Sequence, residues 1–139
     1  NRVVESKTLS DCDKKLIEET KDLSKDLRTN MDNQNLNNYI KSVINISFIT
    51  NKYINDEEPW KLKKNDKVKM NNVLYLALEQ IARISILLNP IIPIATQKVL
   101  NALNLKSNSL NLSFLDNNNI LSKEVEIKEL NILFKKVIK

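Results

Sequence analysis

The sequence contains no glycine and no histidine, and it has a single cysteine among its 139 residues. Without histidine, neither a Ser-His-Asp nor a Cys-His catalytic site can be assembled, and a zinc site would need carboxylate ligands. Without glycine, the chain has neither a P-loop nor a Rossmann fingerprint. Because Cys12 has no partner for an internal disulfide, we expect a reducing compartment and no metal on this chain.

Turn-forming residues are also scarce, since only three prolines accompany the missing glycine. Sandwiches and barrels of many strands need such residues at their turns. The sequence therefore favours an all-α fold, an antiparallel bundle of about four to five helices with an irregular C-terminal extension. Asparagine can replace glycine in the left-handed position after a helix, and we expect this of Asn30, Asn89 and Asn104.

The composition is that of a globular protein, with 42% hydrophobic and 28% charged residues. The longest apolar run, around residues 86–88, is far shorter than the roughly 20 residues of a membrane span, and the N-terminus lacks a signal-peptide layout. We expect a cytoplasmic protein without a membrane partner. An excess of 22 Lys and Arg over 17 Asp and Glu gives a net charge of +5, which permits an anionic partner without establishing one.

Residues 1–104 carry the pattern of the bundle. The first predicted helix begins after Ser10, an N-cap residue, and its narrow apolar stripe runs to Met31. The second runs from near Leu36 to residues 54–57, because Pro59 disfavours helix in the residue before it. A basic connection over residues 61–69 leads into a central helix over 66–88, and Pro93 suits the first turn of a fourth helix.

The rest of the chain, residues 105–139, reads as a loop and packing tail. Asn and Ser dominate its first half, and residues 130–137 have a helical arrangement of apolar side chains, so we expect a helical end. The opening residues carry neither a start methionine nor a cap. We interpret residues 1–139 as one domain, a C-terminal fragment of a longer protein.

Trp60 is the only tryptophan, and it follows Pro59 at a predicted helix end. Aromatic stacking contributes about 1–3 kcal/mol per base when single-stranded nucleic acid binds, and Lys61, Lys63 and Lys64 are placed to neutralise its phosphates. The alternative is a tryptophan that fills the gap between two helices. Likewise the amide of Asn51 suits a base edge, or a bond to nearby backbone.

Two further groups of polar residues offer weaker chemistry. Cys12 lies at a helix N-terminus, which favours a thiolate, but the neighbouring Asp11 and Asp13 oppose it. The three acids at residues 56–58 point in different directions from the chain, and we expect them to face solvent at the bend. Neither group predicts a catalytic site.

Three segments of the chain resemble landmarks of the C-terminal anticodon-binding domain of methionyl-tRNA synthetases, which are class I aminoacyl-tRNA synthetases. The stretch NKYIN at residues 51–55, followed by PWKL at 59–62, is similar to the family's Asn-Lys/Arg-Tyr-Ile/Val-Asp and Pro-Trp segments. Residues 87–93 (LLNPIIP) look like its LxPxxP helix junction. Residues 132–137 (ILFKKV) look like its closing LFxxI segment.

The resemblance implies roles for particular residues. Trp60 would stack on an anticodon base, and Pro59 would shape the turn. Arg2 is similar to the arginine of an Asn-x-x-x-Arg pair on the family's first helix, and with Asn51 and Asn55 it would contact base edges. Asn55 stands where the family usually has aspartate, so a charge-dependent role there is in doubt.

The implied function is recognition of the CAU anticodon loop of methionine tRNA, with no DNA partner. The family's His-Ile-Gly-His and Lys-Met-Ser-Lys-Ser signatures are absent, so this chain carries no catalytic residues and no cofactor. A catalytic domain of the same polypeptide would bind ATP, magnesium and, in some cases, zinc, and would attach methionine to the tRNA. Alternatives are an anticodon domain of another class I synthetase and a non-catalytic helical module that binds proteins.

Overall fold

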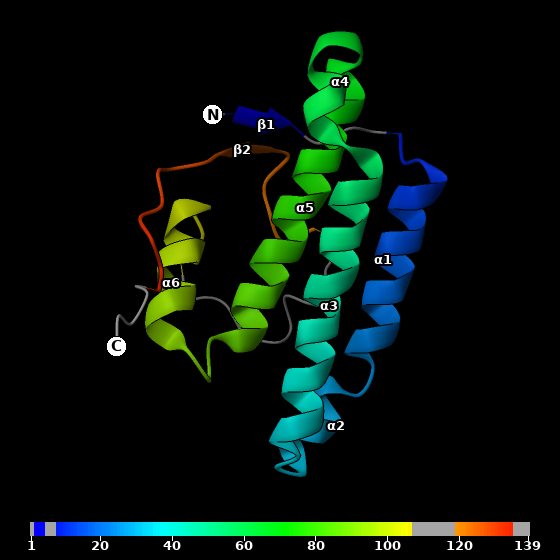
Figure 1. Ribbon diagram of the computed structural model, residues 1–139. Coiled ribbons are helices and arrows are strands. Elements are labelled where there is room, and N and C mark those ends of the chain that lie inside the picture. The colour runs from blue at the N-terminus through cyan, green and yellow to red at the C-terminus, as the bar shows by residue number, and fades with distance from the viewer. Residues whose placement is uncertain (1, 5–7, 107–118, 135–139) are drawn as a thin grey trace, which may run out of the picture.

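The computed structural model describes residues 2–4, 8–106 and 119–134 (Figure 1). Helices α1, α3 and α5 lie side by side, α4 continues beyond one end of this layer, and α6 lies beside α5 on the side away from α1. The expected helical bundle is confirmed. The elements in chain order are β1 (Arg2–Val4), α1 (Asp11–Ser24), α2 (Leu27–Asp32), α3 (Leu36–Glu57), α4 (Pro59–Asn65), α5 (Lys67–Leu88), α6 (Pro93–Ala102) and β2 (Glu124–Glu126).

The first predicted helix is divided into α1 and α2. Ser10 caps α1 as expected, but the hydroxyl of Ser24 donates to the carbonyl of Thr20 at 2.7 Å, a local bond that competes with the helical ladder. The chain turns at residues 25–26. The turn brings Leu27 into an apolar cluster with side chains of α3 and α5, so the expectation of one helix reaching Met31 was wrong.

The long helices α3 and α5 supply most of the core, as their apolar patterns predicted. One face of α3 buries Tyr39, Val43 and Ile46, and the Tyr39 hydroxyl donates to the backbone carbonyl of Leu87 at 2.7 Å. This bond satisfies the one polar atom of a ring that is otherwise enclosed. Among the described residues, no helix is long and apolar enough to cross a membrane.

Left-handed backbone occurs at three of the described residues, Gln34, Glu58 and Asn104. The expectation for Asn104, which follows α6, is confirmed. It was wrong for Asn30, which lies inside α2, and for Asn89, whose φ of −56° is that of a right-handed helix. At the end of α5 the backbone amides of residues 89, 91 and 92 bond back to the helix, so no left-handed cap is required.

The C-terminal tail packs against the bundle over residues 119–127. β2 pairs with β1 in an antiparallel ladder that sets Val3 opposite Val125, and both side chains are buried. The carboxylate of Glu79, on α5, accepts the backbone N–H groups of Ile120 and Leu121 at distances from 2.6 to 3.3 Å. The sequence analysis did not anticipate this short sheet.

The expected helical end is contradicted over residues 130–134, which form no helix. Residues 135–139, and with them the rest of that expectation, lie outside the described residues. The chain leading to this segment is held by α6 instead: the amide of Lys128 donates to the carbonyl of Ala102 at 2.9 Å, and the Asn104 side chain donates to the carbonyl of Glu126 at 2.6 Å. These contacts attach residues 126–128 to the end of α6 and the turn that follows it.

Candidate nucleic-acid interface

A sharp bend separates α3 from α4 and determines where Trp60 lies. Glu58 has φ 43° and ψ 58°, so the helix cannot continue through it, and Pro59 begins α4 with its ring buried. The Glu58 carboxylate accepts from the Lys61 ammonium at 2.7 Å across the first turn. Trp60 is left 58% exposed. The alternative in which this tryptophan fills a gap between helices was therefore wrong.

A buried carboxylate, that of Asp13, contacts the last turns of α3 next to the bend. Asp13, on α1, is 1% exposed and accepts from the Tyr53 hydroxyl at 2.6 Å, from the Asn72 side-chain amide at 2.6 Å and from the Ser10 backbone at 2.8 Å. Burial, and then the bond to Asp13, raises the pKa of Tyr53. One carboxylate thus ties α1, α3 and α5 together near the last turn of α3. Tyr53 therefore belongs to the interior of the bundle.

Glu57, the last residue of α3, forms a second contact between α3 and α5. Its side chain is only 8% exposed and pairs with the Lys69 ammonium of α5 at 2.8 Å, a contact that raises the pKa of Lys69. The expectation that all the acids of residues 56–58 face solvent was wrong for Glu57. Because α4 connects α3 to α5, this ion pair joins the two ends of the loop that carries Trp60.

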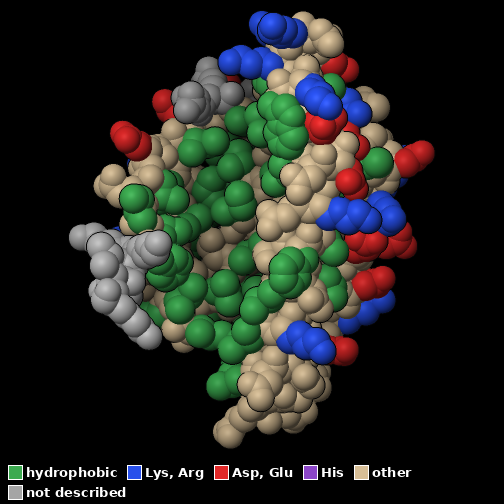
Figure 2. Space-filling view, in the orientation of Figure 1, with side chains coloured by type: hydrophobic (Ala, Val, Ile, Leu, Met, Phe, Trp, Pro, Cys, Tyr) green, Lys and Arg blue, Asp and Glu red, His purple; other side chains and the backbone are tan. Residues whose placement is uncertain are grey.

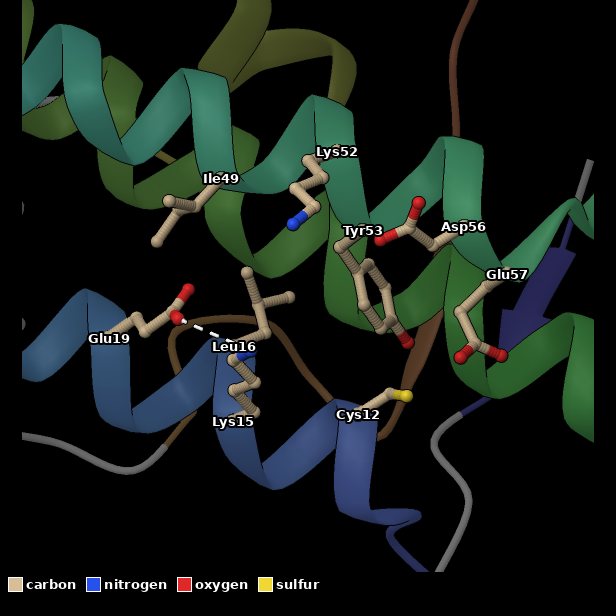
Figure 3. Close-up of a pocket in the computed structure, with 9 residues that line it drawn as sticks. All are labelled: Cys12, Lys15, Leu16, Glu19, Ile49, Lys52, Tyr53, Asp56 and Glu57. Carbon is tan, nitrogen blue, oxygen red and sulfur yellow. Dashed lines mark ion pairs between the residues drawn. The ribbon is translucent and has the colours of Figure 1, made fainter.

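A small cavity of about 130 Å³ opens between α1 and α3 beside this ion pair. Figure 3 shows the Cys12 thiol, the Tyr53 hydroxyl and the Glu57 carboxylate turned toward the same space. The hydrogen bond to Glu57 raises the pKa of Cys12, which keeps the thiol protonated and weakly nucleophilic. Across the described chain, no three His, Cys, Asp or Glu side chains gather as metal ligands.

The side chains predicted to contact RNA lie on α3 and α4. Asn51 and Asn55 are exposed and stand four residues apart on α3, which places them on one face of the helix that runs toward Trp60. On α4, Lys63 and Lys64 are exposed like Trp60, and so is Lys61, although its ammonium is paired with Glu58. The structure therefore brings the amides, the tryptophan and the lysines to one end of the molecule.

Arg2 is placed differently from what the resemblance implies. Its backbone belongs to β1 and lies opposite Glu126 of β2, whereas the family pair stands on a helix. The ladder is favoured because Val3 packs into the main apolar cluster from an extended chain. The side chain of Arg2 is outside the described part of the structure, so its contact with RNA stays a prediction.

Sequence reasoning missed two apolar side chains on the same face of α3. Phe48 is 64% exposed and Ile44 is 43% exposed, and the sequence analysis singled out neither. The spacing of residues 44, 48, 51 and 55 was the signal available, since they fall on one side of a helix. In the view of Figure 2, charged side chains crowd the α1 side, and few lie over the middle of α3.

Three comparisons bear on the family. The model of the anticodon-binding domain of methionyl tRNA ligase matches residues 3–139. The methionine–tRNA ligase of Phocaeicola vulgatus is 28% identical over 129 residues, 93% of this chain and 19% of that protein. That of Rickettsia conorii is 36% identical over 106 residues, 76% of this chain and 21% of that protein.

Among solved structures, the apo form of Mycobacterium tuberculosis methionyl-tRNA synthetase superposes with a TM-score of 0.89 at 20% identity. The match covers 99% of this chain and 28% of that one. This likeness supports the fold alone. The chain spans about a fifth of the length of the curated relatives. From the family match across nearly all of its residues, the chain belongs to the family of anticodon-binding domains of methionyl-tRNA ligases.

Proposed function

We propose that this domain binds the CAU anticodon loop of methionine tRNA through the bend between α3 and α4. The observation that carries the proposal is the exposure of Trp60, 58%, on a turn fixed from two sides. Covering an exposed indole with a partner removes apolar surface from water and is favourable. An unstacked base of an RNA loop is such a partner, since it can lie flat on the ring.

The surroundings of Trp60 suit an RNA loop. Asn51 and Asn55 present amide groups, which both donate and accept hydrogen bonds and so match the edges of bases. Lys63 and Lys64 are exposed one turn along α4 and would lie near phosphates. An amide at Asn55, where the resemblance has a carboxylate, reads a base edge without repelling the backbone. Pro59 contributes by fixing the turn, because its buried ring begins α4.

In the longer protein, the domain serves an enzyme that attaches methionine to its tRNA with ATP. The support is that the relatives named methionine–tRNA ligase are about five times longer than the segment they share with this chain. A catalytic domain of the same polypeptide would bind ATP, magnesium and the methionine, and the reaction belongs to the cytoplasm. This chain supplies the selection of the tRNA.

The test is the anisotropy of a labelled RNA stem–loop bearing CAU, titrated with the protein beside a stem–loop of unrelated anticodon. We expect tighter binding of the CAU loop, and a loss of roughly 5- to 150-fold for Trp60→Ala, the range of one base–aromatic stack. Trp60→Phe should recover part of the affinity. The matched control is Ile94→Ala, because Ile94 is 77% exposed on α6. Equal affinity for both loops would contradict anticodon recognition.

A further inference from the structure

The exposed stripe of α3 continues beyond the amides that face the bend. Asn55, Asn51, Phe48 and Ile44 follow at intervals of four, three and four residues, so all lie on one side of the helix. Phe48 lies seven residues, or about 10 Å, from Asn55 along the helix axis. At 64% it is more exposed than Trp60. Along the chain, an exposed aromatic residue therefore lies on each side of the two amides, Phe48 before them and Trp60 after them.

The charges on this helix suit a polyanion. From residue 36 to residue 55 the helix contains two lysines, Lys41 and Lys52, and no acidic residue. Both lysines are exposed. Lys41 lies one turn before Ile44, and Lys52 lies one turn after Phe48. By contrast, α1 mixes both signs and pairs Lys14 with Asp11 and Lys15 with Glu19. Between residues 36 and 55 a phosphate backbone that follows α3 meets no carboxylate of that helix; the acids of α3, Asp56 and Glu57, come only at its last two positions.

We propose that Phe48 is a second stacking position, which holds another unpaired base of the same RNA loop that covers Trp60. A strand leaving Trp60 along the stripe passes Asn55 and Asn51 before it reaches Phe48. Ile44 then packs against the edge of that base, and Lys41 contacts a flanking phosphate. The inference rests on the proposed function, and it adds a nucleotide to the contact surface.

The composition of the stripe favours RNA over a protein partner. Cores of protein interfaces are depleted in lysine, whereas here lysines flank the aromatic ring on both sides along the helix. Two apolar side chains beside amides also make a small patch, less than a stable protein contact buries. Sequence-tolerant binding of single strands combines these same groups, aromatic platforms and a cationic track.

The experiment compares Phe48→Ala, Phe48→Leu and Phe48→Tyr for binding of the CAU stem–loop, with Ile94→Ala as the control. We expect Phe48→Ala to weaken binding roughly 5- to 150-fold, Phe48→Tyr to bind within about threefold of the unaltered protein, and Phe48→Leu to behave like alanine, since leucine has no ring to stack. A fluorescent base, 2-aminopurine, placed at single loop positions should respond to Phe48→Ala and to Trp60→Ala at different nucleotides.

The outcomes separate the inference from the function on which it rests. If Trp60→Ala weakens CAU binding and Phe48→Ala does not, the second stacking position is overturned and anticodon recognition stands. If Phe48→Leu binds as well as the unaltered protein, the contact is ordinary apolar packing and the inference again fails. If neither variant matters and the CAU loop has no preference, the proposed function itself fails.

Discussion

Replacing Tyr53 by phenylalanine tests whether the buried Asp13 carboxylate holds the bend-bearing end of the bundle together. The substitution keeps the ring and removes only the hydroxyl that donates to Asp13 at 2.6 Å. Hydrogen bonds to charged groups contribute about 1.5–3 kcal/mol, and those between neutral groups about 0.5–1.5 kcal/mol. Because Asp13 is 1% exposed, its carboxylate is left with one hydrogen bond fewer in a buried site. We expect a loss of about 2 kcal/mol in the free energy of unfolding.

The matched control is Tyr39→Phe, which also deletes a buried tyrosine hydroxyl on α3. Its acceptor is the neutral carbonyl of Leu87 at 2.7 Å, so the expected loss is about 1 kcal/mol. Urea unfolding followed by circular dichroism measures both variants against the unaltered protein. Equal losses would refute the reasoning that the charge of Asp13 strengthens the network.

The pH dependence of stability gives the same network a second test. Burial and the bond to Asp13 raise the folded-state pKa of Tyr53 above its ordinary value of 10.0, so above that pH the unfolded chain loses a proton that the folded chain keeps. The stabilisation is complete below pH 10 and is lost as the pH rises through the folded pKa, by up to about 1.4 kcal/mol per pH unit. Tyr53→Phe should make this alkaline decline shallower.

Two further predictions concern the packed tail and the thiol. Glu79→Gln should lower the free energy of unfolding by about 1.5–3 kcal/mol and speed hydrogen exchange at the amides of Ile120 and Leu121, because both bond to the carboxylate; unchanged exchange would contradict this. Cys12 should react slowly with a thiol reagent at pH 8 and faster in Glu57→Gln, since the Glu57 carboxylate raises the thiol pKa. Equal rates would show that Glu57 does not control it.

The sequence predicted the long helices well, because their signals are local. Ser10 and Asp13 form the capping box, Pro59 ends α3, and the apolar pattern of α5 is dense enough to identify a central helix. The errors arose where distant residues decide the local backbone. The pairing of Val3 with Val125 joins opposite ends of the chain, and no pattern within either segment identifies its partner.

The candidate site likewise contains some residues that local sequence predicts and others whose placement depends on distant parts of the chain. Trp60 and the turn at Pro59 follow from their position after a helix, but the exposure of Phe48 depends on which side of α3 the neighbouring helices cover. The burial of Glu57 depends on Lys69, which reaches it only after α4 reverses the chain. Acids in a run look alike in sequence, and the fold alone distinguishes Glu57, which is buried and pairs with a residue of another helix.

The intrinsic fluorescence of Trp60 tests the account most directly, since it is the sole tryptophan. The protein would be titrated with a methionine tRNA stem–loop bearing CAU and, in parallel, with one bearing an unrelated anticodon, at several salt concentrations. We predict saturable quenching by the CAU loop that is weaker for the other loop and falls with salt, as phosphate contacts require. Unchanged fluorescence with both loops, in protein whose helical circular dichroism is intact, would contradict the claim that Trp60 receives an anticodon base.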